Sequence, residues 1–142
     1  MNMRKKLTTL TLVGMMSLGF TASTMAAGVG YVNFNALMTA HKNMPKAEAT
    51  MKAATEDATK TFNKQSASMQ DEKDKKALAQ QLEQKLSAQQ KALLDPIVAD
   101  IKKQVEAVRK TKGLDAIVDQ GFIIAGSENV IDVTNDVGQR IK

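Results

Sequence analysis

The chain has 142 residues and no cysteine, which excludes disulfide bonds, thiolate metal sites and cysteine-based catalysis. Its 20 Lys and Arg residues outnumber its 15 Asp and Glu residues, for a net charge of +5, and it has a single His. Four Phe, one Tyr and no Trp leave few aromatic side chains for a large core.

Residues 1–26 have the pattern of a secretory signal peptide. Three positive residues (Arg4, Lys5 and Lys6) precede an apolar run over residues 7–20, and small residues follow up to Ala27. The run is too short to cross a bilayer comfortably, so we favour cleavage after Ala26 over the alternative of a membrane anchor. Cleavage leaves 17 basic and 15 acidic residues, a net charge of +2.

Residues 46–112 have the composition of long, solvated helices, because they lack Gly, Trp and Tyr and are rich in Ala, Lys, Gln and Leu. Apolar residues recur every three or four positions, which places them along one face of a helix. The first seam is Ala47, Met51, Ala54, Ala58, Phe62, Gln65 and Met69. The second seam is Leu78, Leu82, Leu86, Gln90, Leu94, Ile97, Ile101, Val105 and Val108.

Ser and Asp cluster over residues 66–74, and both residue types favour helix caps over helix interiors. We therefore predict an antiparallel helical hairpin over residues 46–112 with its tip near position 70. In such a hairpin Pro45 and Pro96 lie level with each other, so both are hinge candidates at the root of a projecting tentacle.

The segments on either side of the hairpin read as a small mixed body of residues 27–45 and 113–142. We predict a strand over residues 28–34, a short helix over 36–41 capped by Asn35, strands over 114–119 and 122–125, and a last helix capped by Thr134. In that last helix Val137 and Ile141 are expected to point inward. The fold class is therefore α+β.

So small a body, without disulfides, rarely sustains a core alone, and three short strands leave open edges. We predict that bodies associate by pairing strands between subunits into a β-barrel-like unit. The residues expected in this association are Tyr31, Val32, Phe34, Ile117, Val118, Phe122, Ile123 and Ile124.

No pattern for catalysis is present, and no cofactor or metal is expected. The single His41 has no Cys, Asp or Glu near it in the sequence, so we interpret it as a surface or helix-end residue. Residues 42–112 carry a net charge of +5 and residues 113–142 a net charge of −3, a dipolar arrangement. Nucleic acid is not an expected partner, because the mature chain has a net charge of only +2 and follows a signal peptide.

Both ends of the mature chain resemble those of the Skp/OmpH periplasmic chaperones. The likeness lies in Tyr31-Val32-Asn33-Phe34-Asn35 after the signal peptide, in residues 113–119, and in Val130-Ile131-Asp132-Val133-Thr134 before the closing Ile141-Lys142. The resemblance implies a homotrimer in which three tentacles surround a cavity. It also implies that unfolded outer-membrane proteins are held in this cavity, in the periplasm and without ATP.

By this resemblance, the client-binding surface lies on the tentacle. Its candidates are Met51, Phe62, Met69, Lys73, Lys75, Lys76, Leu78, Leu82 and Lys85. By charge alone, Lys73, Lys75, Lys76 and Lys85 are also candidates for contacts with anionic lipid or lipopolysaccharide headgroups. The alternative is a coiled-coil spacer or scaffold of the cell envelope, which should have a well-packed seam. Gln65, Gln90 and the alanines favour a pliable clasp instead.

Overall fold

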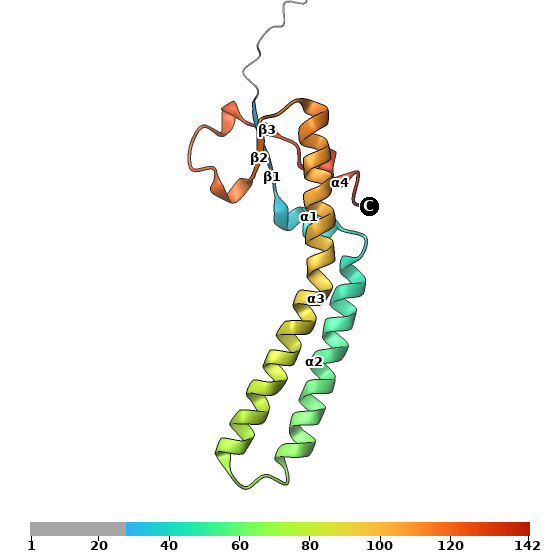
Figure 1. Ribbon diagram of the computed structural model, residues 1–142, viewed down its shortest axis with the longest axis vertical. Coiled ribbons are helices and arrows are strands. Elements are labelled where there is room, and N and C mark those ends of the chain that lie inside the picture. Colours follow the sequence, from blue (N-terminus) through green and yellow to red (C-terminus); the bar gives the residue numbers. More distant parts are fainter. Residues whose placement is uncertain (1–27) are drawn as a thin grey trace, which may run out of the picture.

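The computed structural model describes residues 28–142, and the predicted signal peptide of residues 1–26 lies outside them. The chain is mostly helical, with a small three-stranded sheet at one end and two long helices that extend away from it (Figure 1). This arrangement agrees with the predicted α+β class.

The sheet is parallel, with the order β2-β1-β3. The central strand β1 (Val29–Val32) pairs with β2 (Ala116–Asp119) on one side and with β3 (Ile131–Asp132) on the other. Gly30 makes the close packing possible, since a Cβ there would lie 2.8 Å from Leu114 Cδ1. These three strands pair within one chain.

The prediction of a strand over residues 122–125 was wrong. The chain turns at Asp119, whose Oδ1 accepts a hydrogen bond from the Gly121 backbone N–H at 2.8 Å. This bond caps the short 3₁₀ helix η1 (Gln120–Phe122), and a second one, η2 (Ser127–Asn129), follows. The third strand is instead Ile131–Asp132, which the sequence places in a loop-to-helix connection.

Two helix starts also differ from the prediction. Helix α1 (Phe34–Ala40) begins two residues early because Asn33, not Asn35, caps it, with its Oδ1 accepting from Ala36 N at 2.9 Å. Helix α4 (Thr134–Gly138) has Thr134 inside it rather than as its cap. Thr134 Oγ1 instead accepts a hydrogen bond from Asn33 N at 2.9 Å, which joins the segment before the hairpin to the segment after it.

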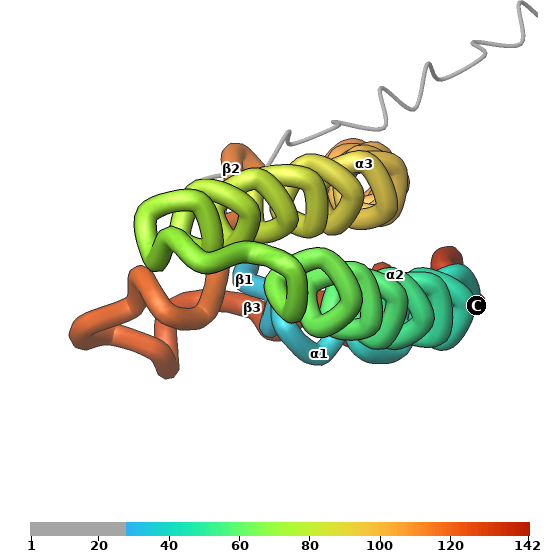
Figure 2. The backbone as a smooth tube through the Cα atoms, turned by 90° about the horizontal axis from the view of Figure 1, so that it is seen from below, coloured from blue at the N-terminus to red at the C-terminus, as the bar shows by residue number. Residues whose placement is uncertain are grey.

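Helix α2 (Met44–Ser66) carries Pro45 in its first turn, where its missing N–H costs no hydrogen bond, and ends before a short loop. Helix α3 (Glu72–Lys112) then returns alongside α2 (Figures 1 and 2). Asp71 caps the start of α3, with its Oδ1 accepting from Lys73 N at 2.8 Å. Gly113, at a φ of 63°, ends α3 in the left-handed conformation that favours glycine.

Pro96 does not interrupt α3, which runs through it for 41 residues and bends along its length (Figure 1). His41, in the turn before α2, lies 2.9 Å from Asp100, one turn beyond Pro96 in α3. That Pro45 and Pro96 lie level and act as hinges stays a prediction.

One hydrophobic core joins the sheet, the short helices and the upper part of α3. Its members are Val32, Leu37, Met44, Ala47, Ile97, Ile101, Val108, Leu114, Val133, Val137 and Ile141. Val137 and Ile141 point inward as predicted, each with no exposed surface. The core extends beyond residues 27–45 and 113–142, since α3 contributes Ile97, Ile101 and Val108. This weakens the argument that the body is too small to fold without partners.

We call residues 51–92 the distal arm, and the other described residues the body. Of the residues buried in the distal arm, Leu78 is the one large apolar side chain, at 9% exposed. Gln65 and Gln90 are exposed rather than part of the seam, so they do not make it more pliable. The interpretation that these two glutamines favour a clasp over a spacer was therefore wrong.

Candidate functional site

The seam of the distal arm leaves open space between its two helices. Ala54 and Ala58 of α2 face Leu82 and Leu86 of α3 across a cleft of about 360 Å³. Ala58, Leu82 and Leu86 also line a second cleft of about 230 Å³, which extends to Phe62. Because an alanine side chain cannot fill the space opposite a leucine, the two helices touch without closing the seam.

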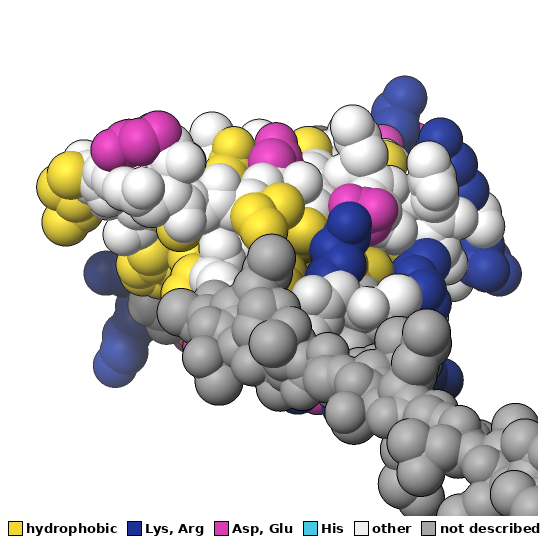
Figure 3. All heavy atoms as spheres, turned by 90° about the horizontal axis from the view of Figure 1, so that it is seen from above, with side chains coloured by type: hydrophobic (Ala, Val, Ile, Leu, Met, Phe, Trp, Pro, Cys, Tyr) yellow, Lys and Arg dark blue, Asp and Glu magenta, His cyan; other side chains and the backbone are white. Residues whose placement is uncertain are grey.

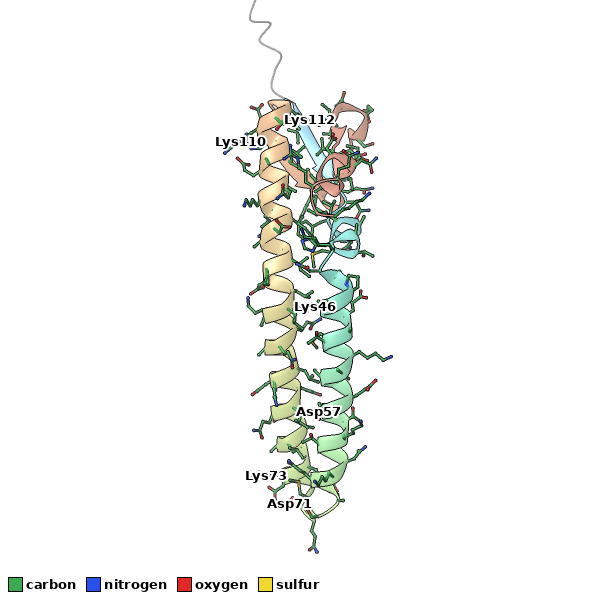
Figure 4. All side chains as sticks on the ribbon, turned by 90° about the vertical axis from the view of Figure 1, so that its right-hand side faces the viewer. Lys46, Asp57, Asp71, Lys73, Lys110 and Lys112 are labelled. Atoms are coloured by element: carbon green, nitrogen blue, oxygen red, sulfur yellow. The ribbon has the colours of Figure 1, made fainter. Side chains whose placement is uncertain are left out.

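Charged side chains stand at the edge of these clefts without bridging the helices. Asp57 and Lys85 line the larger cleft from opposite helices, and Figure 4 shows Asp57 midway along α2. Within residues 28–142, no ion pair joins α2 to α3. The distal arm therefore depends on a thin apolar seam.

The structure brings some of the predicted client-binding residues together. Phe62 and Leu82 line the smaller cleft, and Leu82 and Lys85 line the larger one. Met51 and Met69 are half-buried at other levels of the seam. Leu78 is buried between the helices, so in this conformation it supports the arm rather than presenting a surface.

The lysines near the tip form a separate group. Lys73 and Lys76 are exposed in the first turns of α3, and Lys73 lies beside Asp71 at the end of the arm (Figure 4). Lys75 is half-buried and donates to Glu72 Oε1 at 2.7 Å. Acidic residues thus alternate with these lysines, which reduces the net positive charge that an anionic headgroup would meet.

The body has an exposed apolar patch on the segment that follows β2. Phe122 is 80% exposed, Ile124 is 99% exposed and Ile131 is 51% exposed. A space-filling view of this end of the molecule shows hydrophobic side chains at its surface (Figure 3). Large apolar side chains at such exposure mark an interaction surface more often than a free one.

The other predicted association residues divide between surface and core. Tyr31, Phe34, Ile117, Val118 and Ile123 are half-buried. Val32 is 3% exposed and belongs to the core of its own chain. A groove of about 220 Å³ between α3 and β2 is lined by Phe34, Ile117 and Val118. Val105 also lines it, a residue that the sequence analysis placed in the helical seam and not among the association residues.

Sequence reasoning also missed a buried polar pair. His41 ends α1, as the helix-end interpretation has it, but it is 2% exposed and so not a surface residue. Its Nε2 lies 2.9 Å from Asp100 Oδ2. The two residues are 59 positions apart, so no local pattern could reveal the pair. The only signal available was the helical register that places position 41 opposite position 100.

Three carboxyl groups have a lowered pKa, each for a local reason. Hydrogen bonds from His41 and then Gln104 lower the pKa of Asp100. The side chain and backbone of Thr134 lower the pKa of Asp132. The Arg109 guanidinium lowers the pKa of Glu106 to about 2. All three serve helix ends or helix contacts, and none lies in a cleft of the distal arm.

Within the described part of the chain, no three His, Asp or Glu side chains come close enough together to hold a metal ion. None of the helices in residues 28–142 has a stretch long and apolar enough to cross a membrane. The surfaces identified above can bind other molecules through apolar contact and charge.

Comparison with known families gives one match. The model of the family described as outer membrane protein (OmpH-like) matches residues 73–141. No curated protein gives a significant match to the chain. The family match confirms the resemblance stated above and supports a periplasmic chaperone of the Skp/OmpH kind. The matched residues 73–141 comprise nearly all of α3 and the C-terminal part of the body.

Proposed function

We propose that this protein is an ATP-independent periplasmic holdase that binds unfolded outer-membrane proteins and prevents their aggregation. The observation that carries this proposal is the OmpH-like match, which covers the returning helix of the arm and the C-terminal part of the body. The clefts of the distal arm support it, since a thin seam with open space can adapt to varied apolar segments.

In this proposal the distal arm is the tentacle and Met51, Phe62, Met69, Leu82 and Lys85 contribute to the client surface. Phe62 is the residue we expect to contribute most, because it is a half-buried aromatic side chain at the edge of a cleft. Lys85 adds a positive charge beside the larger cleft. Weak contacts spread over such a surface suit a protein that must release its client.

We further propose that three copies associate through their bodies. Phe122, Ile124 and Ile131 form the exposed patch that association would cover, and the edges of β2 and β3 remain available for further pairing. The three arms of such a trimer would surround a cavity for the client. Residues 1–26 would be removed as a signal peptide during export.

The test is a dilution assay on the mature protein. A urea-unfolded outer-membrane barrel protein is diluted with and without the chaperone, in the absence of nucleotide, and light scattering follows its aggregation. We expect suppression near three protomers per client, with a trimer in sedimentation analysis. A Phe122→Ser/Ile124→Ser variant should dissociate, whereas Asn129→Ser in the same segment should remain a trimer.

The alternative is an envelope spacer. Gln65 and Gln90 do not count against it, because both are exposed and do not interrupt the apolar seam. A trimer that leaves aggregation unchanged would support the spacer and overturn the holdase. A monomer at the concentrations of the assay would overturn the trimeric architecture.

A further inference from the structure

His41 is the one polar or charged residue that is fully buried in residues 28–142. It lies at the end of α1, in the turn that leads into α2, where the body continues into the arm (Figure 1). No part of the proposed client surface or of the exposed apolar patch explains why a titratable ring is buried at this junction.

Both nitrogens of the ring are hydrogen-bonded to other elements. Nδ1 accepts from the Asn43 backbone N–H at 3.1 Å, and Nε2 lies 2.9 Å from Asp100 Oδ2. Because Nδ1 accepts a hydrogen bond, the proton of the neutral ring is on Nε2, which donates to Asp100. The ring therefore connects the start of α2 to the middle of α3.

The bond to Asn43 matters because α2 has little else to cap its start. Asn43 is the N-cap of α2, and its side chain makes no capping hydrogen bond. The turn is held further by Met44 N, which donates to His41 O at 2.9 Å, and by Lys42 N, which donates to Ile141 O at 3.2 Å. The ring thus adds a polar contact at the start of α2, beside Met44 and Ala47, which pack into the core.

The elements around the ring carry charges of both signs. Helix α1 has none, the turn has Lys42, and the first turns of α2 have Lys46 and Glu48. The nearby part of α3 has Asp100, Lys102 and Lys103, and the C-terminal side has Asp136, Arg140 and Lys142. Of these groups, Asp100 is the one in the described chain that is bonded to the ring.

We propose that His41 is the positioning residue of the arm, and that protonation of its ring frees the first turn of α2 while the contact with Asp100 persists. A protonated ring carries an N–H on both nitrogens, so Nδ1 would then present a donor to the donor of Asn43. The bond that orients the start of α2 is lost, and the arm samples a wider range of angles. This inference rests on the proposed function and deepens it, because it makes the range of angles of the client-binding arm depend on pH.

Asp100 keeps its charge through the change. Hydrogen bonds from His41 and Gln104 lower its pKa, so it is a carboxylate at the mildly acidic pH at which histidines titrate. The ring therefore remains attached to α3 by an ion pair when its contact with α2 breaks. Acidification should move α2 relative to α3 and the body rather than unfold the junction.

The chain is well suited to a direct test, because it has one His and no Cys. The ring can be followed alone by proton NMR as the pH falls from about 7.5 to about 5.5. Spin labels on Gln70→Cys at the tip and Gln139→Cys on the body report the arm's distance distribution over the same range. Labelled mature chain is diluted into excess unlabelled chain, so that only distances within one chain are measured.

We expect the distance distribution to broaden with the same midpoint as the His41 titration. His41→Gln places an amide near the Nε2 position, does not titrate, and should abolish the pH-dependent change. Asp100→Asn keeps the hydrogen-bond acceptor without the charge, and should shift the midpoint of both measurements together. A His41 ring that titrates while the distances stay constant would overturn the inference.

A ring that does not titrate above about pH 5 would also overturn it. Should His41→Gln fail to fold, the comparison of the two midpoints in the unmodified background still decides the question. None of these measurements uses a client, so their failure is separate from failure of the holdase proposal. Conversely, an arm that moves with pH in a protein that does not suppress aggregation would support this inference and contradict the holdase proposal.

Discussion

The body and the distal arm differ in how closely their side chains pack. In the body, Ile97, Ile101 and Val137 from two helices are at most 2% exposed, and hydrogen bonds join segments a hundred residues apart. In the distal arm, alanines face leucines across open clefts, and no ion pair in the described chain joins the two helices. The difference indicates a rigid base that carries a pliable projection.

A cavity in the body core should give the largest loss of stability. Ile101 has no exposed surface, so Ile101→Ala should lower the free energy of unfolding by about 2–5 kcal/mol. Leu82→Ala in the half-buried seam should cost clearly less, because little packing is lost there. Urea denaturation followed by circular dichroism measures both, and equal losses would contradict the division into two regions.

Gly30 tests how tightly the sheet packs. An Ala at this position would bring its Cβ to 2.8 Å from Leu114 Cδ1 and 3.3 Å from Ile131 O. Gly30→Ala should therefore cost about 1–3 kcal/mol of stability. Gly28→Ala is the matched control, since its Cβ would meet Leu114 at an ordinary 3.7 Å. If the two variants melt at the same temperature, the sheet can relax and the body is less rigid than we argue.

Filling the seam should make the arm more like the body. Ala58 lines both clefts, so Ala58→Leu should stabilise the arm by about 0.5–2 kcal/mol and, by the holdase proposal, weaken suppression of aggregation. Ala53→Leu, at an exposed position of the same helix, should change neither property. A filled seam that holds clients as well as before would show that the clefts do not matter for binding.

Removing the cap of α3 should act on the arm alone. Asp71→Ala loses the bond to Lys73 N and should cost about 1 kcal/mol, confined to the residues near the tip. Amide exchange should rise in the first turns of α3 and stay constant in the body. The control is Gln70→Ala in the same loop, and a change in the body amides would mean that the two regions are coupled.

The smallest expected effect is the pH dependence due to Glu106. The Arg109 guanidinium lowers the pKa of Glu106 from its usual 4.5 to about 2. Its stabilising contribution is therefore complete above about pH 4.5 and is lost as the pH falls toward 2. Glu106→Gln should slightly flatten the loss of stability in this range, measured by urea midpoints. An unchanged profile would mean that the pair with Arg109 contributes nothing.

Local patterns predicted the parts of the fold that depend on neighbouring residues. Periodicity placed Leu78, Ile97 and Ile101 on the inner face of α3. The end of the predicted hairpin at residue 112 agrees with the end of α3, which Gly113 caps. The same period also placed Gln65 and Gln90 in the seam, but both are exposed. Gln65 lies in the last turn of α2, where that helix ends.

Long-range contacts decided the features that the sequence did not reveal. Ile131–Asp132 became a strand because β1 offers it a parallel edge, while Phe122–Ala125, with a better strand composition, has no partner in its own chain. His41 is buried because α3 brings Asp100 to it. For the candidate site, the apolar residues of the seam were predictable, but the clefts between them depend on how the two helices sit side by side.

The most direct test of the contrast lies within a single helix. Native-state hydrogen exchange on the mature chain compares amides of residues 78–92 of α3 with amides of residues 97–108 of the same helix. We predict that the first group exchanges through frequent local opening, and that the second group exchanges only with global unfolding. Equal protection along the whole of α3 would contradict a pliable arm on a rigid body.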